Sequence, residues 1–360
     1  MKHFLLLLSG SLLHVAISSL SPSSHFVPII DMAPLRDASA SPDARAKTVA
    51  QIGKACETSG FFHVINHGIS AQLDADFETQ MKAFFQLSLE EKLKVKRTND
   101  NSRGFADDEL TKQRRDWKEL FDFGHVPDRR LSPDHPCNLV VDGYNQWPES
   151  LPDFEATMLS YYDACCALSQ QLVCAITESL GLAPNELMKE FAEHSSFLRL
   201  NWYPPASGVS SSSEVLGISR HTDAGGLTVL RQDEVNSLQV YSGTKEDNAD
   251  GEWVTVTPPR EALTINVGDM LQVWTNGLYQ APEHRVKANK TRERFSAPFF
   301  YNPSYETRVA PLPVRSPLSR DGSPAYLPMT WKHFRSQRFA GDYNDVGKEI
   351  QIENFLVQNK

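Results

Sequence analysis

The chain has few cysteines and no concentrated run of positive charge. Its five cysteines are an odd number without CxxC spacing, which argues against a structural zinc site and against a disulfide-stapled secreted fold. The 36 lysines and arginines are outnumbered by 45 acidic residues, and no basic run is flanked by aromatic residues. A formal charge of -9 gives no general attraction for phosphate backbones, so nucleic acid is not an expected partner.

Long apolar runs are also scarce, and the one at the N-terminus is short. Lys2 precedes an apolar stretch that ends in small residues, and Ala16-Ile17-Ser18 resembles a cleavage site. We therefore expect residues 1–20 to be a cleaved targeting signal that directs the protein to the endoplasmic reticulum or, through a bipartite leader, to a plastid. If the leader is not functional, the protein stays in the cytoplasm. The stretch is shorter than the ~20 apolar residues of a membrane span, so the mature chain should have no such span.

With 360 residues and 40% hydrophobic content, the chain can bury a large core, and its patterns divide it into two parts. Helix-start signals and apolar periodicity predict helices over residues 41–60, 70–85 and 151–180, and a further helix that begins at residue 88. From Phe197 onward, short runs rich in β-branched and aromatic residues predict strands at 198–203, 227–230, 238–241, 253–256, 263–267 and 271–274. Many evenly spaced short strands indicate a jelly roll or a barrel, with the helices packed around it.

Two histidines and one aspartate form a candidate metal site. His221 and Asp223 are two residues apart, so on an extended segment their side chains leave the same face. His284 lies in a second expected strand, which we predict to form a hairpin with the strand that carries Arg294 and Ser296. Two neutral imidazoles and one carboxylate leave metal positions open, as expected of a non-haem Fe(II) oxygenase. An inward-facing arginine needs an anion, and its planar fork suits a carboxylate.

Six motifs carry a family resemblance that spans residues 28–301. They are Gly60–Gly68, Leu198–Pro204, the His221/Asp223 pair, Asn266–Asp269, His284–Val286 and Arg294–Ser296. In this order they resemble the motifs of the Fe(II)/2-oxoglutarate-dependent dioxygenases of the isopenicillin-N-synthase-like family. The resemblance implies an α+β fold with a double-stranded β-helix (jelly roll) core flanked by N-terminal and central helices.

The resemblance also implies which side chains bind the cofactors. The implied iron ligands are His221, Asp223 and His284. The implied contacts of 2-oxoglutarate are Arg294 and Ser296, which hold its distal carboxylate, and Tyr203 with Asn201. Two further histidines, His63 and His67, lie in a structural motif of the family and are not expected to be ligands. No acid-base residue is implied beyond the metal centre.

The implied reaction couples oxidative decarboxylation of 2-oxoglutarate by O2 to hydroxylation, or desaturation, of a small organic molecule. Two alternatives remain open on the same residues. One is an Fe(II)/O2 oxidase of the same fold that does not use 2-oxoglutarate, and the other is a non-catalytic, iron-dependent ligand receptor. We expect a small-molecule substrate and a monomer.

We expect five regions along the chain. They are the targeting signal (1–20), an N-terminal dioxygenase region (26–135), a helical support (145–190), the Fe(II)/2-oxoglutarate dioxygenase core (195–305) and a C-terminal lid or packing segment (306–360). The substrate pocket should take its walls from the barrel mouth and from residues 103–123, although that segment also fits a solvated helix joined to a packed strand. In the C-terminal region, Trp331, Phe334 and Phe339 are the candidates for closing the pocket.

Overall fold

A computed structural model describes residues 26–111, 114–124, 143–207, 215–243, 251–343 and 350–357. The predicted targeting signal lies outside these residues, as do Cys137 and the side chain of Phe339. Among the described helices, none combines the length and the apolar character that crossing a membrane requires.

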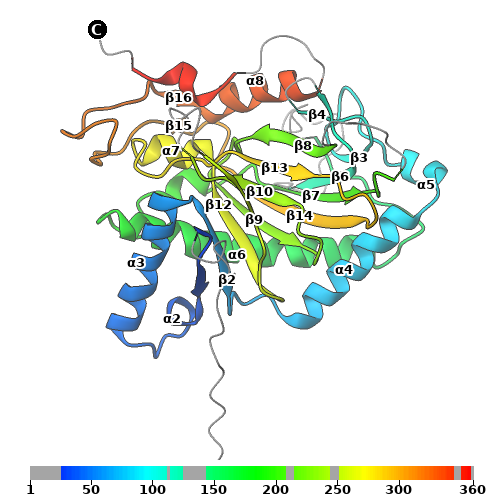
Figure 1. Cartoon of the computed structure of the whole chain (residues 1–360), viewed down its shortest axis with the longest axis horizontal. Coiled ribbons are helices and arrows are strands. Elements are labelled where there is room, and N and C mark those ends of the chain that lie inside the picture. The colour runs from blue at the N-terminus through cyan, green and yellow to red at the C-terminus, as the bar shows by residue number, and fades with distance from the viewer. Residues whose placement is uncertain are drawn as a thin grey trace, which may run out of the picture.

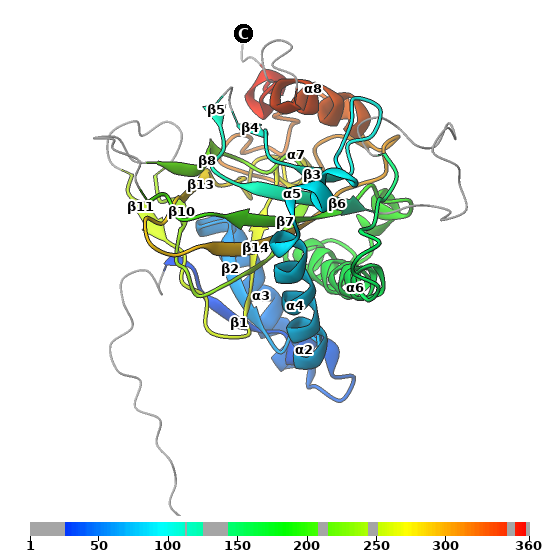
Figure 2. The same cartoon turned by 90° about the vertical axis from the view of Figure 1, so that its right-hand side faces the viewer.

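Two β-sheets form the centre of the molecule (Figures 1 and 2). The larger sheet has eight strands in the order β1 (Ile29–Asp31), β2 (Phe61–Ile65), β12 (Leu263–Val267), β9 (Leu227–Gln232), β14 (Arg294–Tyr301), β7 (Phe197–Tyr203), β6 (Glu119–Gly124) and β3 (Gly104–Ala106). The smaller sheet has four strands in the order β11 (Trp253–Thr255), β10 (Leu238–Tyr241), β13 (His284–Lys287) and β8 (Leu216–His221). The predicted α+β jelly roll is thereby confirmed.

Helices from the first half of the chain pack around the larger sheet, and some of them contact its strands directly. They are α2 (Ala33–Arg36), α3 (Pro42–Thr58), α4 (Ala71–Gln86), α5 (Leu89–Leu93) and the long α6 (Phe154–Ser179), which packs on β9 and β14 and contacts α3 and α4. The hydroxyls of Ser41, Ser70 and Ser88 accept the hydrogen bonds that begin α3, α4 and α5, as their sequence signals predict.

Shorter elements complete the described part of the chain. They are the strand pairs β4 (Leu110–Thr111) with β5 (Arg114–Arg115) and β15 (Arg308–Val309) with β16 (Met329–Thr330), helices α7 (Asp269–Trp274) and α8 (Trp331–Tyr343), and the 3-10 turns η1 (Met188–Phe191) and η2 (Ile352–Phe355). Figures 1 and 2 show α8 on the opposite side of the sheets from α3, α4 and α6. The C-terminal segment thus returns to the part of the jelly roll that the other helices leave uncovered.

The strand predicted at 271–274 is wrong, because these residues belong to α7. All six residues of α7 are buried, so their apolar run lacks the polar face that reveals a helix. Asp269 is the first residue of this helix and is fully buried. The backbone amides of Asp269 and Met270 donate hydrogen bonds to the carbonyl oxygens of Asp223 and Gly225, so the start of α7 supports the segment that follows His221.

The predicted hairpin of His284 with Arg294 is also wrong. Strand β13 pairs with β10 and β8, whereas β14 pairs with β7 and β9 in the other sheet. The polar stretch between the two strands therefore crosses from one sheet to the other. His284 and Arg294 still line the same cavity, because that cavity lies between the two sheets.

An aromatic cluster joins α4, α6 and the larger sheet. The Phe84 ring is fully buried and lies 4.5 Å from the ring of Phe121, 5.4 Å from that of Phe154 and 5.3 Å from that of Phe85. Such a ring removes a large apolar area from water and leaves a cavity when it is truncated.

We expect Phe84→Ala to lower the free energy of unfolding by about 3–5 kcal/mol, because the neighbouring rings cannot fill the space. Leu327→Ala is the control, since Leu327 is 52% exposed and should cost less than about 0.5 kcal/mol. Denaturant unfolding of both variants measures the difference, and equal midpoints would contradict the role of the cluster.

Candidate metal centre and cavity

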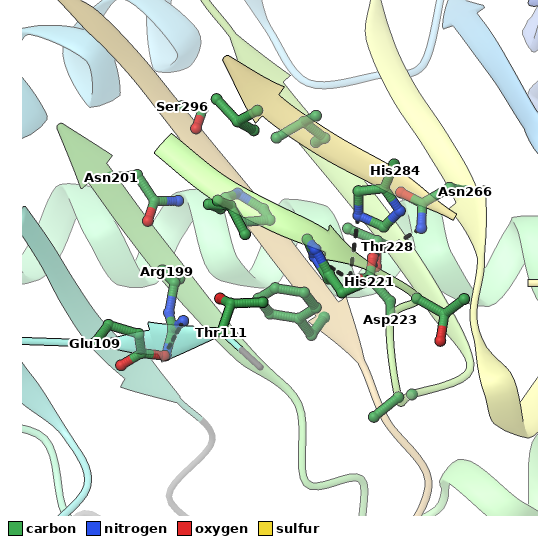
Figure 3. A pocket seen from close by; sticks show the side chains of 18 of the residues that line it. Glu109, Thr111, Arg199, Asn201, His221, Asp223, Thr228, Asn266, His284 and Ser296 are labelled. Atoms are coloured by element: carbon green, nitrogen blue, oxygen red, sulfur yellow. Dashed lines mark hydrogen bonds and ion pairs between the residues drawn. The ribbon is translucent and has the colours of Figure 1, made fainter. Parts of the chain in front are cut away.

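Cross-strand pairing brings the two predicted histidine ligands together. His221 is the last residue of β8, His284 is the first of β13, and the two are register partners in the smaller sheet. Their ring centroids lie 4.2 Å apart. Asp223 follows two residues after His221, and the ligand atoms of all three side chains lie within 4.8 Å of one another. Figure 3 shows the three side chains converging on one side of the cavity.

Both imidazoles are oriented by backbone carbonyls. The Nδ1 atom of His221 lies 2.8 Å from the carbonyl oxygen of Ser219, and that of His284 lies 3.1 Å from the carbonyl oxygen of Pro282. A carbonyl only accepts, so each Nδ1 carries the proton and each Nε2 keeps its lone pair. The Nε2 atoms of His221 and His284 lie 3.7 and 3.6 Å from Oδ1 of Asp223. The free lone pairs and this carboxylate oxygen therefore face one common point.

The second oxygen of Asp223 is held by the protein. Oδ2 accepts hydrogen bonds from Thr228 Oγ1 at 2.5 Å and from Asn266 Nδ2 at 2.8 Å. Burial alone would raise the pKa of Asp223, but His284, His221 and these two hydrogen bonds lower it below its ordinary value. Burial and the neighbouring His284 lower the pKa of His221 to about 3. Near neutral pH the site offers a neutral imidazole and a carboxylate, which suit a divalent transition metal.

Arg294 lies deeper between the sheets and is 2% exposed. Its Nη1 donates to Ser296 Oγ at 3.1 Å, its Nη2 donates to Gln232 Oε1 at 2.9 Å, and its guanidinium lies 5.0 Å from the Tyr203 ring centroid. Arg294 Nε and Asn201 Oδ1 have no hydrogen-bond partner among the described residues, although both are buried. Arg294, Ser296, Tyr203 and Asn201 all line the cavity that holds the metal triad. A buried guanidinium with an unused N–H, beside a hydroxyl, fits a carboxylate ligand.

The outer part of the cavity is made by segments whose role the sequence left undecided. Within residues 103–123 the structure has the strands β3 to β6, and Glu109, Leu110, Thr111 and Lys118 line the cavity. This segment is therefore a pocket wall and not a solvated helix. Glu109 bridges two guanidiniums, with Oε2 2.5 Å from Arg97 Nη1 and Oε1 2.7 Å from Arg199 Nη1. These charged residues were not predicted as site residues.

The C-terminal helix also reaches the cavity. Trp331, Arg335 and Arg338 of α8 line it, whereas Phe334 is buried in the hydrophobic core and is not among the described lining residues. Arg338 Nη2 donates to the carbonyl oxygen of Thr222, between the two predicted ligands His221 and Asp223. No motif around Arg338 indicated this contact, which depends on how the C-terminal segment folds back.

The predicted non-ligands stay outside the centre. His63 Nδ1 lies 3.1 Å from Thr264 Oγ1 and His67 Nε2 lies 2.9 Å from the carbonyl oxygen of Glu261. Burial lowers the pKa of His63 to about 4. Within the described ranges, His221, Asp223 and His284 form the one group of three or more His, Cys, Asp and Glu side chains that is compact enough for a metal ion.

Comparison with known proteins identifies this architecture. Residues 194–303 match the model of the 2OG-Fe(II) oxygenase superfamily, and residues 27–150 match that of the non-haem dioxygenase in morphine synthesis N-terminal domain. A homoarginine-6-hydroxylase, 2-ODD-C23, of Glycine max is 35% identical over 299 residues, which cover 79% of this chain and 88% of that protein. The chain belongs to the Fe(II)/2-oxoglutarate-dependent dioxygenases of the isopenicillin-N-synthase-like superfamily.

Other relatives of this dioxygenase agree with the assignment. The Jasmonate-induced oxygenase 4 of Arabidopsis thaliana is 32% identical, with 86% of this chain and 81% of that protein covered. A crystal structure of JOX2 in complex with 2OG, Fe and JA is 27% identical, covers 92% of this chain and 89% of that chain, and superposes with a TM-score of 0.73. The crystal structure of a dioxygenase for auxin oxidation in rice is 25% identical, covers 87% of this chain and 95% of that one, and superposes with a TM-score of 0.65.

Family membership decides among the three functions left open by the sequence. The dioxygenase uses Fe(II), 2-oxoglutarate and O2 to oxygenate a small molecule, so the oxidase and receptor alternatives fall away. The residues that line the cavity fit both iron and 2-oxoglutarate. The two imidazole lone pairs and the Asp223 carboxylate suit iron, and the buried Arg294 suits a carboxylate of 2-oxoglutarate.

We expect Asn266→Ala to weaken Fe(II) affinity by about 10- to 100-fold, because Asp223 loses one of the two hydrogen bonds that orient it. Anaerobic competition with a chromophoric chelator measures this affinity. Asn185→Ala, at an exposed position, is the matched control. Wild-type iron affinity in folded Asn266→Ala would show that the hydrogen bond does not position the carboxylate.

Proposed function

We propose that His221, Asp223 and His284 hold the iron and that Arg294 and Ser296 bind the distal carboxylate of 2-oxoglutarate, with Tyr203 and Asn201 as further contacts. The convergence of three ligand atoms within 4.8 Å carries the first assignment. The unused Nε of buried Arg294, in the same cavity, supports the second. When bound, iron and 2-oxoglutarate supply the oxidising chemistry, in which 2-oxoglutarate yields succinate and CO2.

The protein's part in this reaction is positioning. The carbonyls of Ser219 and Pro282 hold the imidazoles in one tautomer, and Thr228 and Asn266 hold the carboxylate. Three buried apolar side chains line the same cavity as Arg294, and they are Leu230, Leu238 and Val286. A small molecule bound in the outer part would present a C–H bond to the metal side, and we propose hydroxylation or desaturation of that bond.

We also propose that the active form is a monomer and that residues 306–360 close the cavity. The metal triad, Arg294 and Ser296 are assembled within one chain, which supports a site whose ligands need no second subunit. Trp331, Arg335 and Arg338 of α8 contribute to the lining, which supports a closing role for the C-terminal region.

Anaerobic titration of the purified chain with Fe(II) and then 2-oxoglutarate tests the proposed function. We expect a weak visible metal-to-ligand charge-transfer band, which Asp223→Ala abolishes because the iron is no longer held. We expect Arg294→Ala to shift the band to much higher 2-oxoglutarate concentrations, since a buried charge-assisted contact is lost. Arg308→Ala, at an exposed position on β15, is the control. A normal band in Asp223→Ala would refute the metal assignment.

We propose that residues 1–20 are a cleaved signal for the endoplasmic reticulum or, in a bipartite leader, a plastid. The apolar stretch after Lys2 and the small residues around Ser18 support it. We expect N-terminal sequencing of protein purified from eukaryotic cells to begin after this segment, and a fluorescent fusion without residues 1–20 to spread through the cytoplasm. Retention of the first twenty residues in the mature protein would contradict the proposal.

A further inference from the structure

The outer part of the cavity presents far more positive than negative charge. Among the described lining residues outside the metal triad and Arg294, five are cationic and one is acidic. We call the five cationic residues the cationic wall, and they are Arg97, Lys118, Arg199, Arg335 and Arg338. The acidic residue is Glu109. Figure 3 shows Arg199 and Glu109 on one side of the cavity and the metal triad on the other.

The carboxylates that balance this wall lie mostly behind it. Asp122 binds Arg199 through two hydrogen bonds of 2.8 and 2.7 Å, and Asp116 Oδ2 lies 2.8 Å from Lys118 Nζ. Asp269 lies 3.9 Å from Arg338. None of these three aspartates is among the described residues that line the cavity. The three aspartates hold the cationic side chains in place from outside the cavity lining. A molecule in the cavity therefore contacts the cationic side chains and not these aspartates.

Glu109 does not offer a site for a cationic group. Both of its oxygens are engaged, one by Arg97 and the other by Arg199. Burial would raise the pKa of Glu109, but Arg199 and Arg97 hold it well below the ordinary range. The carboxylate therefore stays charged and serves to fix the two guanidiniums. The other described carboxylate in the lining, Asp223, belongs to the metal triad.

Lys118 has hydrogen-bond donors that can serve a molecule in the cavity. Its side chain is 2% exposed and lines the cavity, and its ammonium pairs with Asp116 among the described residues. An ammonium has three N–H donors, so two of them lack a protein partner there. Burial would lower the pKa of Lys118, but Asp116, Tyr203 and Glu109 raise it above its ordinary value. These two N–H groups can donate to an acceptor in the cavity.

We infer that the substrate is an organic acid whose carboxylate binds at the cationic wall on Lys118, with the rest of the molecule extending toward the metal triad. This inference rests on the proposed function of the same cavity. The co-substrate does not account for the wall, because Arg294 and Ser296 form a separate carboxylate site between the sheets. A carboxylate at Lys118 forms an ion pair as well as a hydrogen bond, and a neutral molecule can form only the hydrogen bond.

The test is anaerobic calorimetric binding to the mature chain loaded with Fe(II) and saturating 2-oxoglutarate. The probes are hexanoic, decanoic and phenylacetic acids, each beside its methyl ester. We expect at least one acid to bind about 10- to 100-fold more tightly than its ester, the range given by a hydrogen bond to a charged group. Esters that bind as tightly as their acids would overturn the inference, and so would a failure of every acid to bind.

Lys118→Met identifies the anchoring residue. It should weaken the preferred acid by about 10- to 100-fold, leave its ester unchanged and leave the 2-oxoglutarate titration of the charge-transfer band unchanged. Lys332→Met is the matched control, because Lys332 lies on α8 outside the lining and pairs with Glu306 at 3.4 Å. If Lys118→Met does not fold with Asp116 left unpaired, Lys118→Met combined with Asp116→Asn removes both charges and should give the same pattern.

The outcomes separate this inference from the proposed function. If the band never forms in the unaltered chain, the proposed function fails. If the band forms normally but acids show no advantage over esters, the inference alone fails. If Lys118→Met shifts the 2-oxoglutarate titration, Lys118 serves the co-substrate and the inference is overturned.

Discussion

The pairing of His221 with His284 across β8 and β13 is the constraint on which the site depends. Register partners in an antiparallel pair place their side chains on the same face of the sheet. Strand pairing alone therefore directs both imidazoles into the cavity. A slip of one residue in either strand would turn one imidazole away from the other. The carbonyls of Ser219 and Pro282, two residues before each histidine, then select the tautomer. Strand register and local backbone together leave two lone pairs facing Asp223.

Asp223 does not lie in the strand pair that carries the two histidines, and its backbone is held in place by the start of the buried helix α7. The amide of Asp269 binds the Asp223 carbonyl, and a Cβ on Gly268 would lie only 2.3 Å from the carbonyl oxygen of Gly225. Glycine at 268 therefore permits the close approach of the two segments. Helix α7 begins at this point because its first amides donate to the backbone carbonyls of Asp223 and Gly225, and these bonds fix the backbone from which the Asp223 carboxylate extends.

The sequence could predict residues whose chemistry is specific, and much less about residues whose role depends on packing. Two histidines, an aspartate and an arginine with a serine form a pattern that fits little besides a metal site next to a carboxylate site, and the structure brings them into one cavity. The strand path between His284 and Arg294 was mispredicted, because a short polar stretch fits a sheet crossing as well as a hairpin turn. Lys118 and Arg199 are of residue types that usually lie on the protein surface, and only the fold shows that they line the cavity.

Helix α8 contacts both the wall of the cavity and the segment between His221 and Asp223. Arg335 and Arg338 are three residues apart, so they lie on the same face of the helix. The guanidinium of Arg335 lies 5.4 Å from the ring centroid of Phe197 on the outer wall, while Arg338 donates to the Thr222 carbonyl between two predicted ligands. A displacement of α8 large enough to widen the cavity would remove this hydrogen bond from the ligand loop. The lining of the substrate side and the positioning of the metal side therefore depend on the same helix face.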